Sequence, residues 1–384
     1  MKVCLLSKMY PPVVGGSGMY AYEIANALAE NDHDVDVYTQ STEDDRTLDV
    51  HENVSVYPLA KARRYLVTFE TLNFSLRARL AVDFDEYDVI HGTLMPASTI
   101  ALSDRLGIDT PVVLTSHSFA LSEVFAHSPE KPADYLLKYA FHPMNVVMDN
   151  IAARSADRII AISDEMRGQL VEQYSLDERN VTRISHGVDI ERYRPREEVH
   201  PAVSDDKLTL LFVGRLISRK GADLAVEAVA ATERDDVELL VAGTGRLESD
   251  LKDLARERGI DDRVQFLGYV PDEDLPLLYS SADATLFTSN YEGFGLVFLE
   301  SLASGTPVIG TAAGGVPDIV EDGTTGFICS EKPAAMAERI GQLADEPENL
   351  TSMSRAARRE VDGRSWEDVA RRVETVYESV VDHE

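Results

Sequence analysis

Two acids eight residues apart enclose a glycine-flanked phenylalanine in the stretch YEGFGLVFLE, residues 291–300. Gly293 and Gly295 allow the backbone to approach a ligand, and a helix expected near Gly295 would direct unpaired N–H groups and a positive dipole end at an anion. Glu292 and Glu300 are acceptor-only carboxylates suited to diols. The pattern predicts a phosphate site between two hydroxyl acceptors, as a sugar nucleotide requires. A surface loop followed by a half-buried helix is the open alternative.

A second group of reactive residues follows a predicted strand at 208–213. Gly214-Arg215 comes directly after this strand, and Lys220-Gly221 comes where a helix is expected to begin. Arginine can bind a diphosphate through forked hydrogen bonds, and lysine can bind it as a point charge. Open parallel sheets bind ligands at the carboxyl ends of their strands. Together with residues 291–300, the two cations therefore favour a binding site over isolated surface charges.

The elements that position these residues fall into two predicted α/β domains. A chain of 384 residues is too long for one ordinary core. Alternating strands and helices imply parallel sheets covered on both faces. We predict one domain at 1–190, a charged, proline-containing linker at 191–207 and a second domain at 208–365. A last helix in 366–384 carries an apolar stripe.

The strands of the first domain are predicted at 2–7, 34–39, 54–57, 88–91, 111–115, 157–162 and 181–185, and those of the second at 208–213, 237–242, 264–267, 284–287 and 308–309. A helix is expected from 17 to 30, with Ser17 as its N-cap. The pattern at 16–21 formally matches the dinucleotide fingerprint. Its first glycine lies too far from the strand, however, and the second strand ends without an acid for a ribose. What remains is a Gly15-Gly16 loop that can lie over a diphosphate.

Composition excludes several classes of protein. A formal net charge of −30 and a pI near 4.6 argue against a nucleic-acid partner, because phosphates would be repelled. The N-terminal apolar run is too short for a signal peptide and no window is long enough to span a membrane, so we expect a cytoplasmic protein. Cys4 and Cys329 give no disulfide framework. Acidic residues spread along the whole chain suggest a halophilic source.

One basic and aromatic run, KARRYLVTFETLNFSLRAR at 61–79, stands out in this acidic chain. Its arginines flank Tyr65, Phe69 and Phe74, which is compatible with a surface for an acceptor or for peripheral contact with the cytoplasmic face of a membrane. The alternative is a helix whose charges simply face water.

Eight motifs occur in one order over nearly the whole chain. They are Gly15-Gly16 after the first strand, TSH at 115–117, SADRIIAIS at 155–163, HGVD at 186–189, GRLISRKG at 214–221, FLGYV at 266–270, EGFGLVFLE at 292–300 and SWEDVA at 365–370. This combination resembles glycosyltransferase family 4, the retaining nucleotide-sugar enzymes with the GT-B fold. The resemblance implies two Rossmann-like, doubly wound parallel-sheet domains facing a central cleft, with the final helix packed back on the N-terminal domain.

The resemblance also implies roles for matching residues. Arg215 and Lys220 would hold the diphosphate of the donor, Glu292 would contact hydroxyls of the transferred sugar, and Glu300 would bind the ribose. His117 resembles the histidine near the transferred sugar and its phosphate. The other implied donor-binding positions act largely through their backbone: Gly15, Gly16, Val270, Phe294, Gly295 and Leu296.

Three residues are left without a settled role. His186 stands where the family usually has Asn before Gly-Val-Asp, so the hydrogen bond of that Asn is in doubt. His91 ends a predicted strand and either lines the acceptor side or is satisfied by backbone. Trp366 is expected to pack the last helix against a domain.

The implied reaction is retaining transfer of a sugar from a nucleoside diphosphate sugar to a glycan or lipid-linked acceptor, without a cofactor or a metal ion. The two glutamates then bind hydroxyls and do not form a hydrolase acid pair. No protein base is assigned, because a phosphate oxygen of the donor takes the proton of the acceptor while the protein stabilises the departing diphosphate. A sugar-nucleotide epimerase and a non-catalytic sugar-nucleotide-binding protein are the alternatives.

Overall fold

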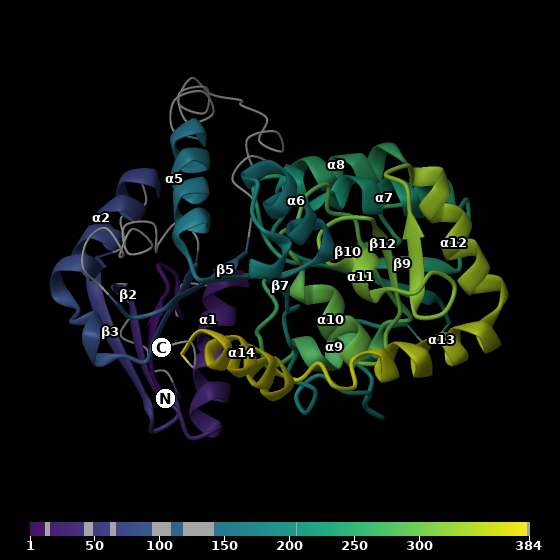
Figure 1. The fold of residues 1–384 in the computed structure, drawn as a ribbon. Helices are drawn as coiled ribbons and strands as arrows, with labels where there is room; N and C mark the ends of the chain where they lie inside the picture. The colour runs from purple at the N-terminus through teal and green to yellow at the C-terminus, as the bar shows by residue number, and fades with distance from the viewer. Residues whose placement is uncertain are drawn as a thin grey trace. The chain divides into compact units, whose positions relative to one another are not determined.

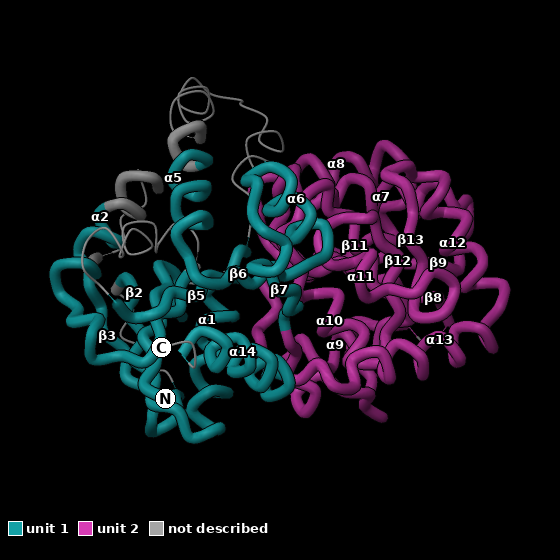
Figure 2. The backbone as a smooth tube through the Cα atoms, in the orientation of Figure 1, with its two compact units in different colours: residues 1–186, 366–384 teal, residues 187–365 magenta. Residues whose placement is uncertain are grey.

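A computed structural model describes residues 1–11, 16–41, 49–61, 67–93, 109–117, 142–204 and 206–381. The chain divides into two compact units, which Figure 2 shows in two colours. Unit 1 comprises residues 1–186 and 366–384, and unit 2 comprises residues 187–365. Within the described ranges, no helix has both the length and the apolar character needed to cross a membrane.

Unit 1 is built on a parallel sheet in which the described strands follow the order β3-β2-β1-β4-β5-β6-β7. Their bounds are β1 Lys2–Leu6, β2 Asp34–Ser41, β3 Val54–Lys61, β4 Val89–Thr93, β5 Val112–Ser116, β6 Arg158–Ala161 and β7 Val181–Arg183. Val3 lies opposite both Val35 and Val89, so β1 pairs on both sides. Burial is continuous from the second residue of β1 onward and through all of β5, because helices cover both faces of a parallel sheet.

Helices pack around this sheet (Figure 1). They are α1 Gly16–Glu30, α2 Val67–Ala81, α5 His142–Ser155, α6 Asp164–Tyr174 and α14 Trp366–Val381, with 3-10 turns at Phe84–Glu86 and Glu178–Asn180. The last helix, α14, packs against α1 and buries the expected apolar stripe, including Trp366, Val369 and Val373. The C-terminus of the chain therefore completes unit 1.

Unit 2 has a parallel sheet in the order β10-β9-β8-β11-β12-β13. Its strands are β8 Leu208–Val213, β9 Val237–Ala242, β10 Val264–Gly268, β11 Ala284–Phe287, β12 Val308–Thr311 and β13 Gly326–Cys329. Its helices are α7 Ala222–Ala231, α8 Glu248–Glu257, α9 Leu275–Ser281, α10 Leu296–Ala303, α11 Val316–Ile319, α12 Pro333–Asp345 and α13 Pro347–Glu360, with a 3-10 turn at Ser218–Lys220.

The strand order of unit 2 reverses between β8 and β11. Strands β9 and β10 extend the sheet on one side of β8, and β12 and β13 extend it on the other side of β11. The connections leave the carboxyl ends of β8 and β11 in opposite directions, and doubly wound sheets bind ligands at such a switch point. The loops after these two strands carry residues 214–221 and 288–295.

Three details of the fold differ from the sequence predictions. Strand β13 was not predicted, because it begins with a glycine directly after a turn-rich stretch. Helix α1 begins at Gly16, so Ser17 lies inside it and its hydroxyl approaches Met9 Sδ at 3.8 Å. Residues 191–207, predicted as a linker, belong to unit 2, where the backbone N–H of Arg196 donates to Ser280.

The basic run at 61–79 is only partly a surface feature. Phe74 is fully buried in helix α2, so it cannot serve as a membrane-facing aromatic. Leu80 on the same helix is 87% exposed, and Arg77 bonds to Asn73 and to the carbonyl of Leu59. Tyr65 and the side chain of Phe69 lie outside the described residues.

Candidate functional site

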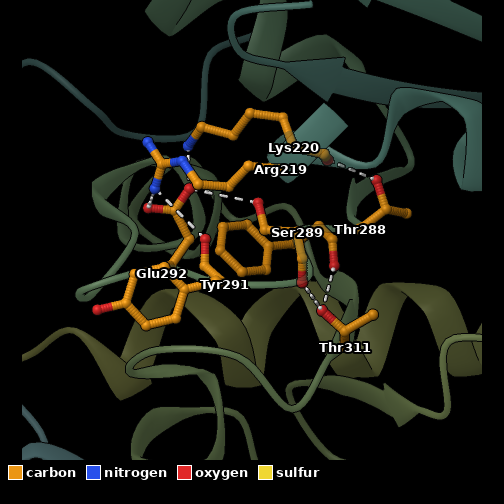
Figure 3. A network of polar contacts seen from close by, with 8 residues as sticks. Arg219, Lys220, Thr288, Ser289, Tyr291, Glu292 and Thr311 are labelled. Atoms are coloured by element: carbon orange, nitrogen blue, oxygen red, sulfur yellow. Dashed lines mark hydrogen bonds and ion pairs between the residues drawn. The ribbon is translucent and has the colours of Figure 1, made fainter. Parts of the chain in front are cut away.

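The candidate site lies on the two loops that leave β8 and β11 in unit 2. The N–H of Asn290 donates to the carbonyl of Arg219 at 3.0 Å, and the hydroxyl of Thr288 donates to the carbonyl of Lys220 at 3.2 Å. A further hydroxyl, that of Thr311 at the end of β12, donates to the carbonyl of Ser289 at 2.6 Å. The first two bonds hold the two loops against each other, and Figure 3 shows the contacts of Thr288 and Thr311.

Gly221 allows this close approach of the two loops. It has φ +66°, a left-handed conformation, and an added Cβ would lie 2.0 Å from the carbonyl oxygen of Thr288. Both the backbone and the space therefore require glycine at the start of helix α7. This position explains why Lys220 is followed by glycine in the sequence.

We expect Gly221→Ala to lower the free energy of unfolding by about 2 kcal/mol or more, because the methyl group clashes with backbone. Gly341→Ala in helix α12 is the matched control, since beyond its chain neighbours and the backbone of its own helix no atom of the described residues lies within 4 Å of its added Cβ. That change should stabilise by about 0.5–1 kcal/mol. Urea unfolding of both variants checks this, and equal effects would contradict the close approach.

Lys220, Arg219 and Glu292 form an ion cluster at the centre of the site (Figure 3). Lys220 Nζ pairs with Glu292 Oε1, and Arg219 Nη1 lies 3.5 Å from Glu292 Oε2. Ser289 Oγ donates to Glu292 Oε1 at 3.3 Å. The side chain of Glu292 is 9% exposed and that of Lys220 is 15% exposed. One carboxylate is thus held by two cations in a site that is mostly shielded from water.

The cluster has more positive than negative charge. Burial lowers the pKa of Lys220, the Glu292 carboxylate opposes that change, and the charges of Arg219 and Arg215 lower the pKa further. Arg215 is exposed, and its effect on Lys220 places its charge near the cluster. Three cations around one carboxylate leave an electrostatic demand for an anion, such as a phosphate group.

The stretch 291–300 forms the rim of this site as a loop that becomes helix α10. Gly295 has φ +101° and precedes the helix, which begins at Leu296. Phe294 is buried and its ring packs against Phe298 at 5.3 Å between centroids. The buried ring anchors the loop. Glu292 and the backbone N–H groups at the start of α10 are therefore held by one anchored segment.

Glu300 lies further along α10 in a partly buried environment. The hydroxyl of Tyr279 donates to its Oε2 at 2.9 Å. Burial raises the pKa of Glu300 to about 6, while the hydrogen bond from Tyr279 and the charge of Arg192 oppose the rise. Arg192 in turn donates to the carbonyl of Asp272 at 2.6 Å, two residues after Val270. This part of unit 2 brings together a hydroxyl acceptor and the loop after β10.

Among the predicted residues of unit 1, Gly16 is exposed at the start of α1, and Gly15 lies outside the described residues. His117 follows β5, and its Nδ1 lies 3.2 Å from Nε2 of His186. The ring of Tyr20, on α1, contacts the ring of His117 edge-on at 4.5 Å between centroids. Helix α1 and the end of β5 therefore meet at His117.

In the described part of the chain, the ring nitrogens of His91 hydrogen-bond side chains. Hydrogen bonding of this histidine to backbone, one of the two expectations for it, is not observed. Its Nδ1 lies 2.6 Å from the hydroxyl of Tyr377, and its Nε2 lies 2.7 Å from Thr115 Oγ1, which also contacts the hydroxyl of Tyr20. Trp366 packs α14 against unit 1, as predicted, through contacts with Tyr20. These contacts form a buried polar chain from α14 through β4 and β5 to α1, and whether His91 lines an acceptor site stays a prediction.

The buried histidines predict acid sensitivity of unit 1. Burial lowers the pKa values of His91 and His186 to about 3. The unfolded chain, with histidine pKa near 6.5, therefore binds more protons at lower pH, and stability falls as pH falls from 6.5 towards 3. Each pH unit in this window costs about 1.4 kcal/mol per histidine.

We expect His91→Gln to remove one histidine's share of this dependence. As the pH falls from roughly 7.5 to 5.5, the unfolding free energy of wild type should decrease by about 1 kcal/mol more than that of His91→Gln. Urea unfolding at both pH values measures it, and the subtraction removes the effect of the large net charge. His200→Gln in unit 2 is the control. A pH-independent difference for His91→Gln would contradict the prediction.

Four contributors to the site were missed by sequence reasoning. They are Arg219, Ser289, Tyr279 and Arg192. Of these, Arg219 could have been identified from the sequence, because it directly precedes Lys220 on the same loop. Ser289 lies three residues before Glu292 on the same loop, whereas Tyr279 and Arg192 become neighbours of Glu300 only through the fold.

Comparison with known proteins identifies the family of this chain. The profile of the group "Glycosyl transferases group 1" matches residues 194–360, and that of "Glycosyltransferase Family 4" matches residues 14–192. The D-inositol 3-phosphate glycosyltransferase of Geodermatophilus obscurus is 30% identical over 92% of this chain and 82% of its own.

Solved structures share the fold. Sucrose-phosphate synthase from Thermosynechococcus elongatus has a TM-score of 0.86 at 22% identity, with 100% of both chains covered. Anabaena HepE in complex with UDP and glucose has a TM-score of 0.73 at 20% identity, covering 99% of this chain and 100% of its own. With both halves matched by family profiles and two parallel α/β units, this chain belongs to glycosyltransferase family 4, within the group 1 glycosyltransferases, and has the GT-B fold.

Proposed function

We propose that this glycosyltransferase moves a sugar from a nucleoside diphosphate sugar to a glycan or lipid-linked acceptor, with retention of configuration. The observation that carries the proposal is the cluster at the switch point of unit 2. There, Lys220 and Arg219 share Glu292, and Arg215 adds a further charge. Such a cluster suits a diphosphate bound next to a group rich in hydroxyls.

In this proposal the cations act mainly on the leaving group. The bond between the anomeric carbon and the diphosphate oxygen breaks, a bond to the acceptor oxygen forms, and the acceptor proton passes to the departing diphosphate. Negative charge grows on the diphosphate during this step, and Lys220 with Arg219 and Arg215 stabilises it. Arriving phosphate oxygens would replace Glu292 as the partner of Lys220.

The two glutamates are proposed to bind hydroxyls. Glu292, released from Lys220 and still facing Arg219, would accept from hydroxyls of the transferred sugar. Glu300 would accept from the ribose, with Tyr279 holding its second oxygen. His117 would hydrogen-bond an oxygen of the substrate, the amides at 294–296 would assist with phosphate or sugar, and Val270 would meet the base. Gly15 and Gly16 would approach the phosphates.

A thermal-shift panel tests the donor class. UDP, GDP and ADP sugars are added to the protein in molar KCl, and UDP-glucose comes first because HepE is known in complex with UDP and glucose. A donor at 100 times its Kd should stabilise by about 2.7 kcal/mol. Inorganic phosphate is the control for simple anion binding. No stabilisation by any nucleotide sugar would refute the proposal.

Separate measurements distinguish the proposed reaction from the alternatives. Incubation of the bound donor without acceptor should yield no epimer, which separates transfer from epimerisation. Transfer to an offered acceptor separates an enzyme from a binding protein. The proposal assigns no metal ion, so activity should persist in EDTA. Equal activity on soluble and membrane-embedded acceptors would argue against a contribution from residues 61–79.

A further inference from the structure

Two imidazoles hydrogen-bond each other in unit 1. His117 follows β5, and His186 is the last residue of the first segment of this unit. The ring of Tyr20 stacks on His186 at 5.2 Å with an interplanar angle of 30° and meets His117 edge-on. Trp366 contacts the outer part of the same group, 6.1 Å from the His186 ring. Aromatic packing on these sides restricts rotation of both imidazoles.

The pair leaves one nitrogen of His117 for another partner. Nδ1 of His117 faces Nε2 of His186 at 3.2 Å, while Nε2 of His117 is buried and has no hydrogen-bond partner among the described residues. A neutral imidazole carries one N–H. If His186 Nε2–H donates, the hydrogen of His117 must be on its Nε2. If His117 Nδ1–H donates, its Nε2 is an acceptor. The direction of this one bond therefore sets the chemistry of His117.

We propose that His186 is a positioning residue that donates Nε2–H to Nδ1 of His117 and so holds His117 as a neutral donor through Nε2. This inference rests on the proposed function. Phosphate oxygens only accept hydrogen bonds, so an unprotonated Nε2 would repel them, whereas Nε2–H can bind them or a sugar hydroxyl. Histidine at this position thereby supplies the fixed N–H that orients its partner.

The surroundings keep the pair neutral. The titratable groups that face His117 are His186, His91 and Tyr20, and within the described ranges no carboxylate acts on it. Burial lowers the pKa of His117 well below its ordinary value, and the neighbouring His186 and His91 lower it further. Because neither ring is charged near neutral pH, the direction of the hydrogen bond is decided by tautomer and not by ionisation.

Long-range ¹H–¹⁵N NMR of the histidine-labelled protein, without ligand, tests the tautomer directly. His117→Gln and His186→Gln variants assign the two rings. We expect His117 to be mainly the Nε2–H tautomer in the wild type and to lose this preference in His186→Leu. In His186→Asn the preference should remain, because the amide N–H can still donate to Nδ1 of His117. An Nδ1–H tautomer at His117 in the wild type would overturn the proposal.

Kinetics test the consequence for the reaction with UDP-glucose as the first donor. His186→Leu should lower kcat/KM about tenfold, the size expected for one lost hydrogen bond, and His186→Asn should restore it to within about threefold. Tyr377→Phe is the control: it removes a buried hydroxyl from His91 and lowers Tm but leaves kcat/KM unchanged. Wild-type kcat/KM in His186→Leu overturns the inference.

The failure of the proposed function has a different signature. If no nucleotide sugar binds the wild type, the proposed function is wrong, and the NMR tautomer still decides the direction of the hydrogen bond. If donors bind but His117→Ala retains full activity, His117 is removed from the proposed site and this inference falls while the donor site of unit 2 stands.

Discussion

Lys220→Gln is expected to lower kcat for sugar transfer about 10²- to 10³-fold and to abolish most of the thermal stabilisation by donor. Lys220 is the cation most enclosed in the cluster, and its ammonium pairs with the shielded carboxylate of Glu292. Glutamine keeps a similar length and an N–H donor for Glu292 but loses the charge that a departing diphosphate requires. Steady-state kinetics and the donor titration measure both effects.

The same variant should remain folded. Arg219 still faces Glu292 Oε2 and Ser289 still donates to Oε1, so the carboxylate keeps two partners. The loss of unfolding free energy should be about 1–3 kcal/mol. Lys252→Gln on helix α8 removes the same charge from an exposed pair with Glu248 and should leave donor binding unchanged. Wild-type donor affinity in a folded Lys220→Gln protein would exclude Lys220 from the diphosphate site.

Much of the fold of unit 2 is predictable from the sequence because its strands are short, apolar and bounded by turns. The predicted bounds of the strands at 208–213, 237–242 and 284–287 match β8, β9 and β11. Local pattern suffices there, since burial on both faces requires continuous apolar runs. Strand β13 is as short as β11, but it was missed because it begins with a glycine after a turn-rich stretch and lies at an edge of the sheet that local pattern does not mark.

The candidate site is less predictable because its partners are chosen by the fold. Lys220 and Glu292 were both singled out from sequence, yet nothing local indicates that they pair across 72 residues. The same limit applies to His186. The sequence shows only an unusual residue before Gly-Val-Asp, and the contact with His117 depends on how β5 and the chain after β7 meet. Motif spacing identifies residue types, whereas tertiary contacts decide their protonation and partners.

Glu300→Gln should stabilise the protein while weakening donor binding. The native pKa of Glu300 is raised from 4.5 to about 6 by burial. The folded state therefore binds more protons than the unfolded state between these values, and this carboxylate's contribution to stability is lost as pH rises through 6. Removing the ionisation should raise the unfolding free energy by about 2 kcal/mol near pH 7.5, and the gain should vanish near pH 4.5.

Donor binding should change in the opposite direction, because a ribose diol needs the acceptor-only carboxylate and the amide offers one acceptor and two N–H donors. We expect donor affinity to fall about tenfold or more in Glu300→Gln. Tyr279→Phe, which removes the hydroxyl that lowers the pKa of Glu300, should move the acidic midpoint of wild-type donor binding to higher pH. Glu248→Gln on the surface of α8 is the control. If Glu300→Gln binds donor as tightly as wild type at pH 7.5, the carboxylate serves stability alone and the ribose must be bound elsewhere.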